Sequence, residues 1–301
     1  MDKRTMLIDN LTVNCISDFR CILGEGPMWD YNKSLLYWVD ILECKIYRYD
    51  PFTHEITKWE TPEYIGFLII NKESKLIAGL RSGLHYIDLN KDGTTTVIRI
   101  DKINEGLENV RFNDGIIDNH GGIWACSMDM NSTEKVGCYY YYDKNLKRTQ
   151  VDKNYTVANG PAVSNDCRFL YTVETVGNNI HKKGIYCSQI VHEGKTENKK
   201  LLIDWSQLDS YPDGIITDRN GNLWIGEFGG NKFRCFSNEG ILKYTIQLPA
   251  WNLTKGVFCD KDDDILYITS ASIGVSKEII DKNPKTGYVF EIKGIQHKRL
   301  Q

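Results

Sequence analysis

Short apolar runs alternate along the chain with turns rich in Asn, Asp, Gly and Lys. Six of these runs are equivalent, and one residue from each marks the period: Leu36, Leu76, Ile123, Leu170, Leu223 and Leu266. Successive marks lie 40, 47, 47, 53 and 43 residues apart. A second β-rich run follows each mark, as at residues 139–142, and turns of this composition join the strands of hairpins. The pattern therefore predicts one β-hairpin repeated six times.

A third element precedes each hairpin and consists of one residue, a glycine and a short apolar run. Its six copies are Glu25-Gly26, Ile65-Gly66, Asp114-Gly115, Asn159-Gly160, Asp213-Gly214 and Lys255-Gly256. Units of roughly 40–50 residues with several strands each are typical of β-propeller blades. A β-sandwich has no reason to repeat one glycine-led signature, and no long amphipathic pattern favours a parallel α/β fold. We therefore predict an all-β, six-bladed β-propeller that occupies residues 1–301 as a single domain.

The residue before each repeated glycine is expected to lie in one ring around the propeller axis, because the first strand of each blade lines the central channel. That ring reads Glu25, Ile65, Asp114, Asn159, Asp213 and Lys255. Four of the six are oxygen donors, and three of those are acidic. Any one of them alone is more easily explained as a turn or strand cap. Together they would repel one another unless a cation offset their charge, so we predict a divalent metal in the channel.

Composition and charge narrow the classes of partner. Of 301 residues, 41% are hydrophobic and 26% charged, which is typical of a globular chain. The 37 Lys and Arg against 40 Asp and Glu give a net charge of −3, so no nucleic-acid surface is expected. No stretch approaches the ~18 apolar residues that span a bilayer, so no membrane partner is expected either. A small-molecule substrate is the remaining expectation, and the oligomeric state stays open.

The expected compartment follows from the cysteines and the start of the chain. Nine cysteines occur with no C-x-x-C pair, which indicates unpaired thiols in a reducing compartment. Residues 1–10 carry charges and lack the apolar segment of a secretory signal. We therefore expect a cytoplasmic protein.

Several motifs resemble those of the regucalcin / senescence marker protein / gluconolactonase family. They are Gly24-Glu25-Gly26-Pro27-Met28-Trp29, Arg111-Phe112-Asn113-Asp114-Gly115, Ala158-Asn159-Gly160, Ser164-Asn165-Asp166, Tyr211-Pro212-Asp213-Gly214 and Gly221-Asn222-Leu223-Trp224. The chain is also similar to the insect branch of this family that includes luciferin-regenerating enzyme. The resemblance keeps order and spacing from about Gly24 to Gly294. It implies a six-bladed propeller with one divalent cation in its channel.

The resemblance also implies roles for particular residues. Glu25, Asn159 and Asp213 match the family's metal ligands, and Asp213 matches its proposed general base. Arg111 and Asn113 match positions that bind substrate. Asp114 and Lys255, which the ring includes, are expected to have supporting roles. Ca²⁺ is the first expectation for the cation, with Mg²⁺, Mn²⁺ and Zn²⁺ as alternatives.

Three departures from the family pattern fall near the expected substrate pocket. Some members place two Glu after a Ser/Thr-Met-Ala run, and one of them contacts the sugar, whereas this chain reads Ser127-Met128-Asp129-Met130-Asn131. The usual Thr-Ser pair is Thr254-Lys255 here, which is expected to place an ammonium at the channel mouth. The Tyr-Ile-Asp-Ser pattern reads Tyr171-Thr172-Val173-Glu174-Thr175. These changes indicate an intact metal site beside an altered pocket.

The leading hypothesis is a metal-dependent hydrolase of small lactones, similar to gluconolactonase, in which Asp213 activates water. One alternative is a hydrolase of a heteroaromatic substrate, similar to luciferin-regenerating enzyme. Another is a calcium-binding regulator of the regucalcin type without turnover. A phosphotriesterase of the related propeller type is a more distant option.

Overall fold

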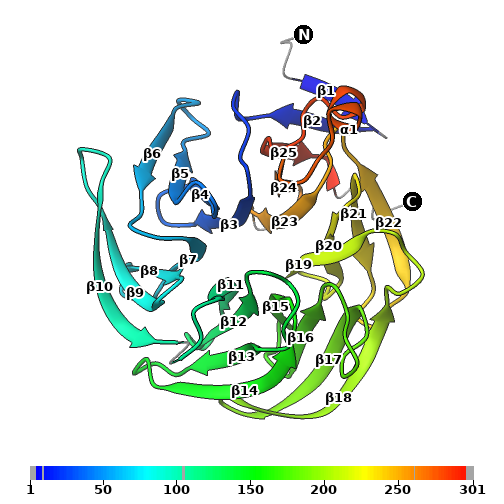
Figure 1. The fold of residues 1–301 in the computed structure, drawn as a ribbon. Coiled ribbons are helices and arrows are strands. Elements are labelled where there is room, and N and C mark those ends of the chain that lie inside the picture. Colours follow the sequence, from blue (N-terminus) through cyan, green and yellow to red (C-terminus); the bar gives the residue numbers. More distant parts are fainter. Residues whose placement is uncertain (1–4, 9, 104–105, 261, 296–301) are drawn as a thin grey trace.

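The six repeated units of the sequence form six antiparallel β-sheets around a common axis (Figure 1). The computed structural model describes residues 5–8, 10–103, 106–260 and 262–295. The prediction of an all-β, six-bladed propeller is confirmed. The segment 1–10, expected to lack a secretory signal, lies partly outside the described residues.

The first five blades each hold four consecutive strands, which run from the axis outwards. Blade 1 contains β3 (Gly24–Asp30), β4 (Leu35–Asp40), β5 (Lys45–Tyr49) and β6 (Ile56–Glu60). Blade 2 contains β7 (Ile65–Ile70), β8 (Leu76–Leu80), β9 (Gly83–Leu89) and β10 (Thr95–Lys102). Blade 3 contains β11 (Val110–Ile117), β12 (Ile123–Asp129), β13 (Gly137–Tyr142) and β14 (Arg148–Tyr155). Blade 4 contains β15 (Ala158–Val163), β16 (Phe169–Glu174), β17 (Gly184–His192) and β18 (Lys195–Asp204). Blade 5 contains β19 (Tyr211–Thr217), β20 (Leu223–Phe228), β21 (Lys232–Phe236) and β22 (Leu242–Gln247).

The sixth blade is assembled from both ends of the chain. Its sheet has the order β1 (Thr5–Ile8), β2 (Leu11–Cys15), β25 (Phe290–Lys293), β24 (Ile265–Ser270) and β23 (Leu253–Phe258). Strand β2 pairs antiparallel with β25, with Val13 opposite Ile292. Leu11 and Val13 are fully buried in the same core cluster as Trp224. This pairing joins the beginning of the chain to its last described strand and closes the ring.

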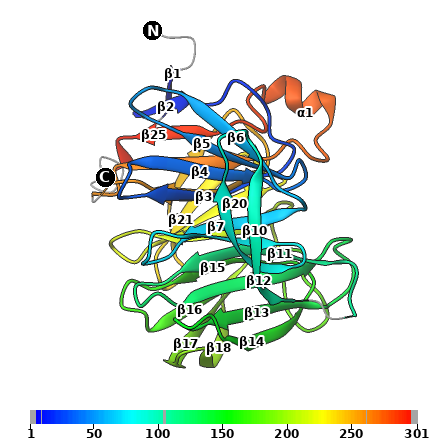
Figure 2. The same ribbon diagram turned by 90° about the vertical axis from the view of Figure 1, so that its left-hand side faces the viewer.

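A short helix, α1 (Lys277–Lys282), connects β24 to β25. Ser276 caps it by accepting a hydrogen bond from the backbone N–H of Ile279. The turned view places α1 at one face of the ring (Figure 2). Within the described ranges, no helix has the length and apolar character needed to cross a bilayer.

The first strands of the blades form the inner wall of the ring. Each contacts the first strand of the next blade, and β23 contacts β3. Glycine permits this close approach: a Cβ atom on Gly66 would lie 2.6 Å from the carbonyl oxygen of Phe112 in the next blade. The glycine-led elements of the sequence are therefore the strands that surround the channel, as predicted.

Each of the first five blades has a fourth, outer strand that the repeat pattern does not predict. Strand β18 shows why, because it reads Lys-Thr-Glu-Asn-Lys-Lys-Leu-Leu-Ile-Asp and exposes much of its length to solvent. An outer strand packs on fewer neighbours, so its sequence needs no apolar run.

All nine cysteines are free thiols, and five of them are buried.

Candidate active site in the central channel

The six ring residues lie at irregular points of their strands. Between the first and second strand of every blade, the pairing register shifts at or next to the ring residue. Gly26 and Gly160 have φ angles of 52° and 39°, in the left-handed region that favours glycine. Bulges of this kind redirect a side chain out of the regular alternation. The repeated residue-glycine signature is therefore the sequence of a bulge that faces the axis.

Glu25, Asn159 and Asp213 come together in the channel. Their exposed fractions are 5%, 4% and 4%, and all three line one cavity of about 420 Å³. The side-chain amide of Asn159 donates a short hydrogen bond to the carboxylate of Asp213. The Glu25 carboxylate accepts the backbone N–H of Gly26 at 2.7 Å. Side chains from blades 1, 4 and 5 thus face one point.

The two carboxylic acids of this group are costly to ionise without a partner. Burial raises the pKa of Glu25 well above its ordinary value, and the nearby charges of Asp213 and Asp114 raise it further. Burial and the charge of Asp114 raise the pKa of Asp213 to about 7. A cation beside these groups would offset both penalties.

The donor set suits a hard divalent cation. Two carboxylates and one amide oxygen match the oxygen ligands that Ca²⁺, Mg²⁺ and Mn²⁺ prefer. Across the part of the chain that the structure describes, no group of three or more His, Cys, Asp or Glu side chains could hold a metal ion. A cation here would therefore need the Asn159 oxygen as its third protein ligand.

Arg111 and Asn113 lie on β11 and line the same cavity. The Arg111 guanidinium donates to the Phe112 carbonyl at 2.9 Å and to Asn113 Oδ1 at 2.7 Å. Asn113 Nδ2 in turn donates to the carbonyl of Ala158 at 3.0 Å. Burial lowers the pKa of Arg111 to about 10, although the carboxylates of Glu25 and Asp213 oppose the shift. This chain of hydrogen bonds fixes a buried cationic donor beside the two acids.

The other three ring residues, Ile65, Asp114 and Lys255, are not among the residues that line this cavity. Ile65 is fully buried in the hydrophobic core with Val39 and Leu80. Asp114 and Lys255 are 1% and 3% exposed, and the Lys255 ammonium lies 2.7 Å from each carboxylate oxygen of Asp114. The expectation of an ammonium at the channel mouth is therefore wrong, because the long side chain runs inward to its carboxylate partner.

The walls of the cavity are largely apolar, and the repeated pattern of the sequence does not predict them. Besides the five polar residues of the site, the cavity is lined by Leu23, Ile41, Leu42, Tyr64, Met128, Met130, Ser132, Val157, Thr175, Val176, Tyr211, Phe228 and Ile273. Many of them flank the strands, where no repeated signature marks them. One signal was available: Met130 falls in the run that lacks the family's two Glu.

A hydroxyl from the neighbouring blade holds the backbone of Asn159. Tyr139 on β13 accepts the N–H of Asn159 at 3.2 Å and the N–H of Val173 at 2.8 Å. It also lies 2.7 Å from the Asn159 carbonyl oxygen and 2.9 Å from that of Val173, to either of which it can donate. The residues 139–142 form a strand, as their β-rich run predicted.

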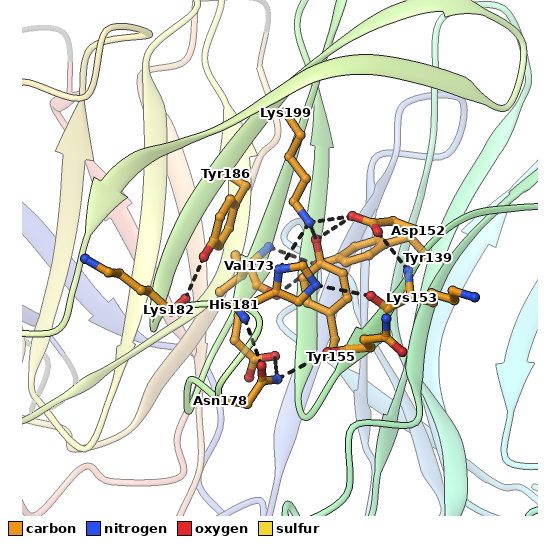
Figure 3. A network of polar contacts seen from close by, with 12 residues as sticks. Tyr139, Asp152, Lys153, Tyr155, Val173, Asn178, His181, Lys182, Tyr186 and Lys199 are labelled. Carbon is orange, nitrogen blue, oxygen red and sulfur yellow. Dashed lines mark hydrogen bonds and ion pairs between the residues drawn. The ribbon is translucent and has the colours of Figure 1, made fainter.

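Tyr139 is itself backed by a polar and aromatic cluster between blades 3 and 4 (Figure 3). The ring of Tyr155 packs edge-on against Tyr139 with centroids 4.8 Å apart, and His181 stacks on Tyr155 at 4.2 Å. The Lys199 ammonium lies 2.6 Å from Asp152 and 2.5 Å from the Tyr155 hydroxyl. This cluster supports the blade junction from which Asn159 projects.

Glu174, at a departure from the family pattern, orders a loop beside the cavity. Its buried carboxylate accepts the backbone N–H groups of Thr156 at 2.8 Å and Val157 at 3.3 Å. It also accepts the N–H of Val176 at 3.3 Å. Val157 and Val176 both line the cavity, so this acid positions two parts of the wall.

Known proteins are similar to this chain over most of its length. The sequence model of the family described as "SMP-30/Gluconolactonase/LRE-like region" matches residues 23–272. The chain is 27% identical over 301 residues to a regucalcin of Danio rerio, covering 97% of this chain and 98% of the relative. It is 29% identical over 282 residues to a 6-deoxy-6-sulfogluconolactonase of Pseudomonas putida, covering 93% and 94%. A solved structure of a luciferin-regenerating enzyme aligns with a TM-score of 0.85 and 25% identity, over 95% of this chain and 96% of that one.

Proposed function

The chain belongs to the SMP-30/gluconolactonase/LRE-like family, and on that premise we propose that it is a hydrolase of small lactones that depends on one divalent cation in its channel. The observation that supports this most directly is the convergence of Glu25, Asn159 and Asp213 on a cavity that also receives Arg111 and Asn113. The first three would hold the cation, and we propose Ca²⁺ before Mg²⁺, Mn²⁺ or Zn²⁺. When bound, such a cation polarises the ester carbonyl and stabilises the negative charge that develops on its oxygen.

Asp213 is the residue we propose as the proton acceptor for the attacking water. Its carboxylate faces the cavity and is oriented by the amide of Asn159. Burial raises its pKa to about 7, in the range where a general base is effective at neutral pH. The Asp213 carboxylate would be less basic with a cation bound to it. Asp213 would then act on a water beside the same cation, because the pKa of that water would be lowered too.

Arg111 and Asn113 are the residues we propose to orient the substrate. The Phe112 carbonyl and Asn113 already hold the guanidinium in place. Substrate binding would therefore cost little further rotational freedom of the Arg111 side chain. It can donate to a ring oxygen, hydroxyl or carboxylate of the substrate, and to the carboxylate product after ring opening.

The cavity wall favours a second candidate substrate. Tyr64, Tyr211 and Phe228 face the cavity with several aliphatic side chains, and Met130 falls in the run where some members of the family place two Glu. Apolar and aromatic walls suit a flat or substituted ring better than a polyhydroxylated sugar. A heteroaromatic substrate of the luciferin-regenerating type is therefore the second candidate.

The test is hydrolysis of a panel of lactones by the chelator-treated protein with Ca²⁺, Mg²⁺, Mn²⁺ or Zn²⁺ restored singly. The panel pairs aldonolactones with lactones that carry alkyl or aryl groups. We expect cation-dependent turnover, with kcat falling at least about a hundredfold in Asp213→Asn. The matched control is Asp88→Asn, the same change at an exposed strand position, which should keep full activity.

Two results would count against parts of this proposal. Full turnover by Asp213→Asn with cation bound would show that another group is the base. Cation binding with no turnover of any lactone would instead support the binding regulator.

A further inference from the structure

The side chain of Lys255 crosses the channel from one blade to the opposite one. Lys255 lies on β23 of blade 6, and its partner Asp114 lies on β11 of blade 3, three places away in the closed ring of first strands. The lysine stem passes over Gly214, where an added Cβ would lie 2.6 Å from both Cβ and Cγ of Lys255. Only a glycine next to Asp213 leaves room for that path.

At the end of this path the ammonium of Lys255 and the carboxylate of Asp114 form a close ion pair. The ammonium lies 2.7 Å from both carboxylate oxygens of Asp114, and the backbone N–H of Gly115 donates to one of them at 2.7 Å. The lysine and aspartate side chains are 4% and 1% exposed. Two charges buried this deeply persist because each satisfies the other.

The pair also divides the channel into two compartments. The cavity of about 420 Å³ receives Glu25, Asn159 and Asp213, and its lining among the described residues includes neither Asp114 nor Lys255. A second cavity of about 460 Å³ lies beyond the pair and is lined by Lys255 together with Gly26, Gly115 and Gly256. The pair therefore lies between the two cavities, behind the three candidate ligands.

Charge explains what the pair does for the site. The ring contains three carboxylates, from Glu25, Asp114 and Asp213, and one ammonium. With Lys255 bound to Asp114, the acids left for a cation are Glu25 and Asp213, whose combined charge of −2 the nearby Arg111 guanidinium offsets only in part. Without the lysine, a third carboxylate would remain uncompensated directly behind them.

We propose that Lys255 is an internal counter-ion that withholds Asp114 from the cation, so that the channel takes one divalent cation on Glu25, Asn159 and Asp213 alone. This is a positioning role, and it rests on the metal site of the proposed function. The ammonium occupies the place that a second cation, or a closer approach of the first to Asp114, would otherwise take. The lysine sets both the number and the affinity of the cations.

A double-mutant cycle tests the role, with Ca²⁺ alone titrated calorimetrically into chelator-treated protein. Lys255→Met leaves the Asp114 charge uncompensated, so we expect Ca²⁺ to bind about tenfold more tightly or with a second equivalent. Asp114→Asn leaves the ammonium uncompensated beside the ligands, so we expect affinity to fall about tenfold. The double variant Asp114→Asn/Lys255→Met, which removes both charges and keeps similar volume, should return within about threefold of the original affinity.

Opposite shifts in the single variants are the signature of a counter-ion. Shifts in the same direction, or no shift in either, would overturn the proposal and leave the pair a packing feature. If Lys255→Met does not fold, the comparison between Asp114→Asn and the double variant still decides, because only a counter-ion makes the single variant the weaker binder. Failure of the proposed metal site itself would look different, since the unsubstituted protein would then bind no Ca²⁺.

Discussion

The hydroxyl of Tyr139 accepts a hydrogen bond from the backbone nitrogen of Asn159, 3.2 Å away, across the junction between blades 3 and 4. The same hydroxyl accepts the N–H of Val173 at 2.8 Å. One side-chain oxygen thus ties together two strands of blade 4 at the residue whose amide oxygen completes the candidate cation site. The Tyr139 hydroxyl contacts only the backbone of Asn159, so it positions that residue while the side-chain amide bonds to Asp213 and to the N–H of Gly160.

Replacement of Tyr139 by Phe should therefore weaken cation binding as well as the fold. The ring still packs against Tyr155, but two buried N–H groups lose their acceptor, at a cost of about 1–3 kcal/mol each in the least relaxed case. We expect Ca²⁺ affinity to fall roughly tenfold when Asn159 shifts. Urea unfolding and calorimetric titration measure the two effects separately.

The matched control for this change is Tyr142→Phe. That hydroxyl donates to Asp101 at 2.9 Å and belongs to the same strand, β13, away from Asn159. It should lower the free energy of unfolding without altering Ca²⁺ affinity. Equal loss of affinity in both variants would mean that Tyr139 acts only through general stability.

Met130 is expected to control the choice between apolar and polyhydroxylated substrates. It lines the cavity in the run where some members of the family have two Glu. Met130→Glu should raise kcat/KM for an aldonolactone relative to an aryl-substituted lactone by about tenfold or more, because a carboxylate can accept hydroxyl donors that a thioether leaves unpaired. The ratio of kcat/KM for the two substrates is the measurement.

Asn145→Glu is the control for that prediction, since Asn145 is exposed in the turn between β13 and β14 of the same blade. It adds the same charge outside the cavity lining of the described residues and should leave the ratio unchanged. An unchanged ratio in Met130→Glu as well would remove Met130 from the determinants of specificity.

Asp129 should make the loop after β12 sensitive to acid. Burial raises the pKa of Asp129, but the backbone N–H groups of Glu134 and Thr133, each 2.9 Å from one carboxylate oxygen, lower it more, so that it lies below its ordinary value. A depressed pKa contributes stability that is fully present above the unfolded value of about 3.9 and is lost as the pH falls through the folded value.

The comparison of Asp129→Asn with the unsubstituted protein measures this contribution. We expect the variant to be less stable by about 1–3 kcal/mol at pH 7. The difference should shrink below about pH 4, where the aspartate becomes protonated first in the unfolded chain and then, at its lowered pKa, in the folded protein. Urea unfolding at pH 7 and pH 3 gives both differences. A penalty that is the same at both values would show that the carboxylate charge has no part in holding the loop.

The fold was predictable as far as the repeated signature extends. The bulge that turns Glu25, Asn159 and Asp213 toward the axis requires a glycine at the same place in each blade, so the sequence carries it six times. Strand β18 has no such constraint because its outer face is solvated, and its polar residues gave no signal. Helix α1 is six residues long, too short for an amphipathic period to show.

The ring of candidate site residues was predictable from the sequence, but the paths of their side chains and the cavity wall were not. Blade periodicity places Asp114 and Lys255 in one ring, but only the structure shows the lysine side chain reaching across the axis to bind both oxygens of the aspartate. A flexible four-carbon stem can point outward or inward from the same backbone position. The cavity wall was harder to predict, because Tyr64 precedes β7 and Phe228 ends β20, at places that share no repeated pattern.

The pairing of β2 with β25 has a consequence for the synthesis of the chain. Residues 11–15 leave the ribosome long before their partners, residues 290–293. Until β25 is made, β2 can pair only with β1, Leu11 and Val13 lack the core of blade 6, and the growing ring remains an open arc with an unpaired strand edge. The unclosed propeller therefore exposes the apolar side chains of an early-made strand until its last blade is complete.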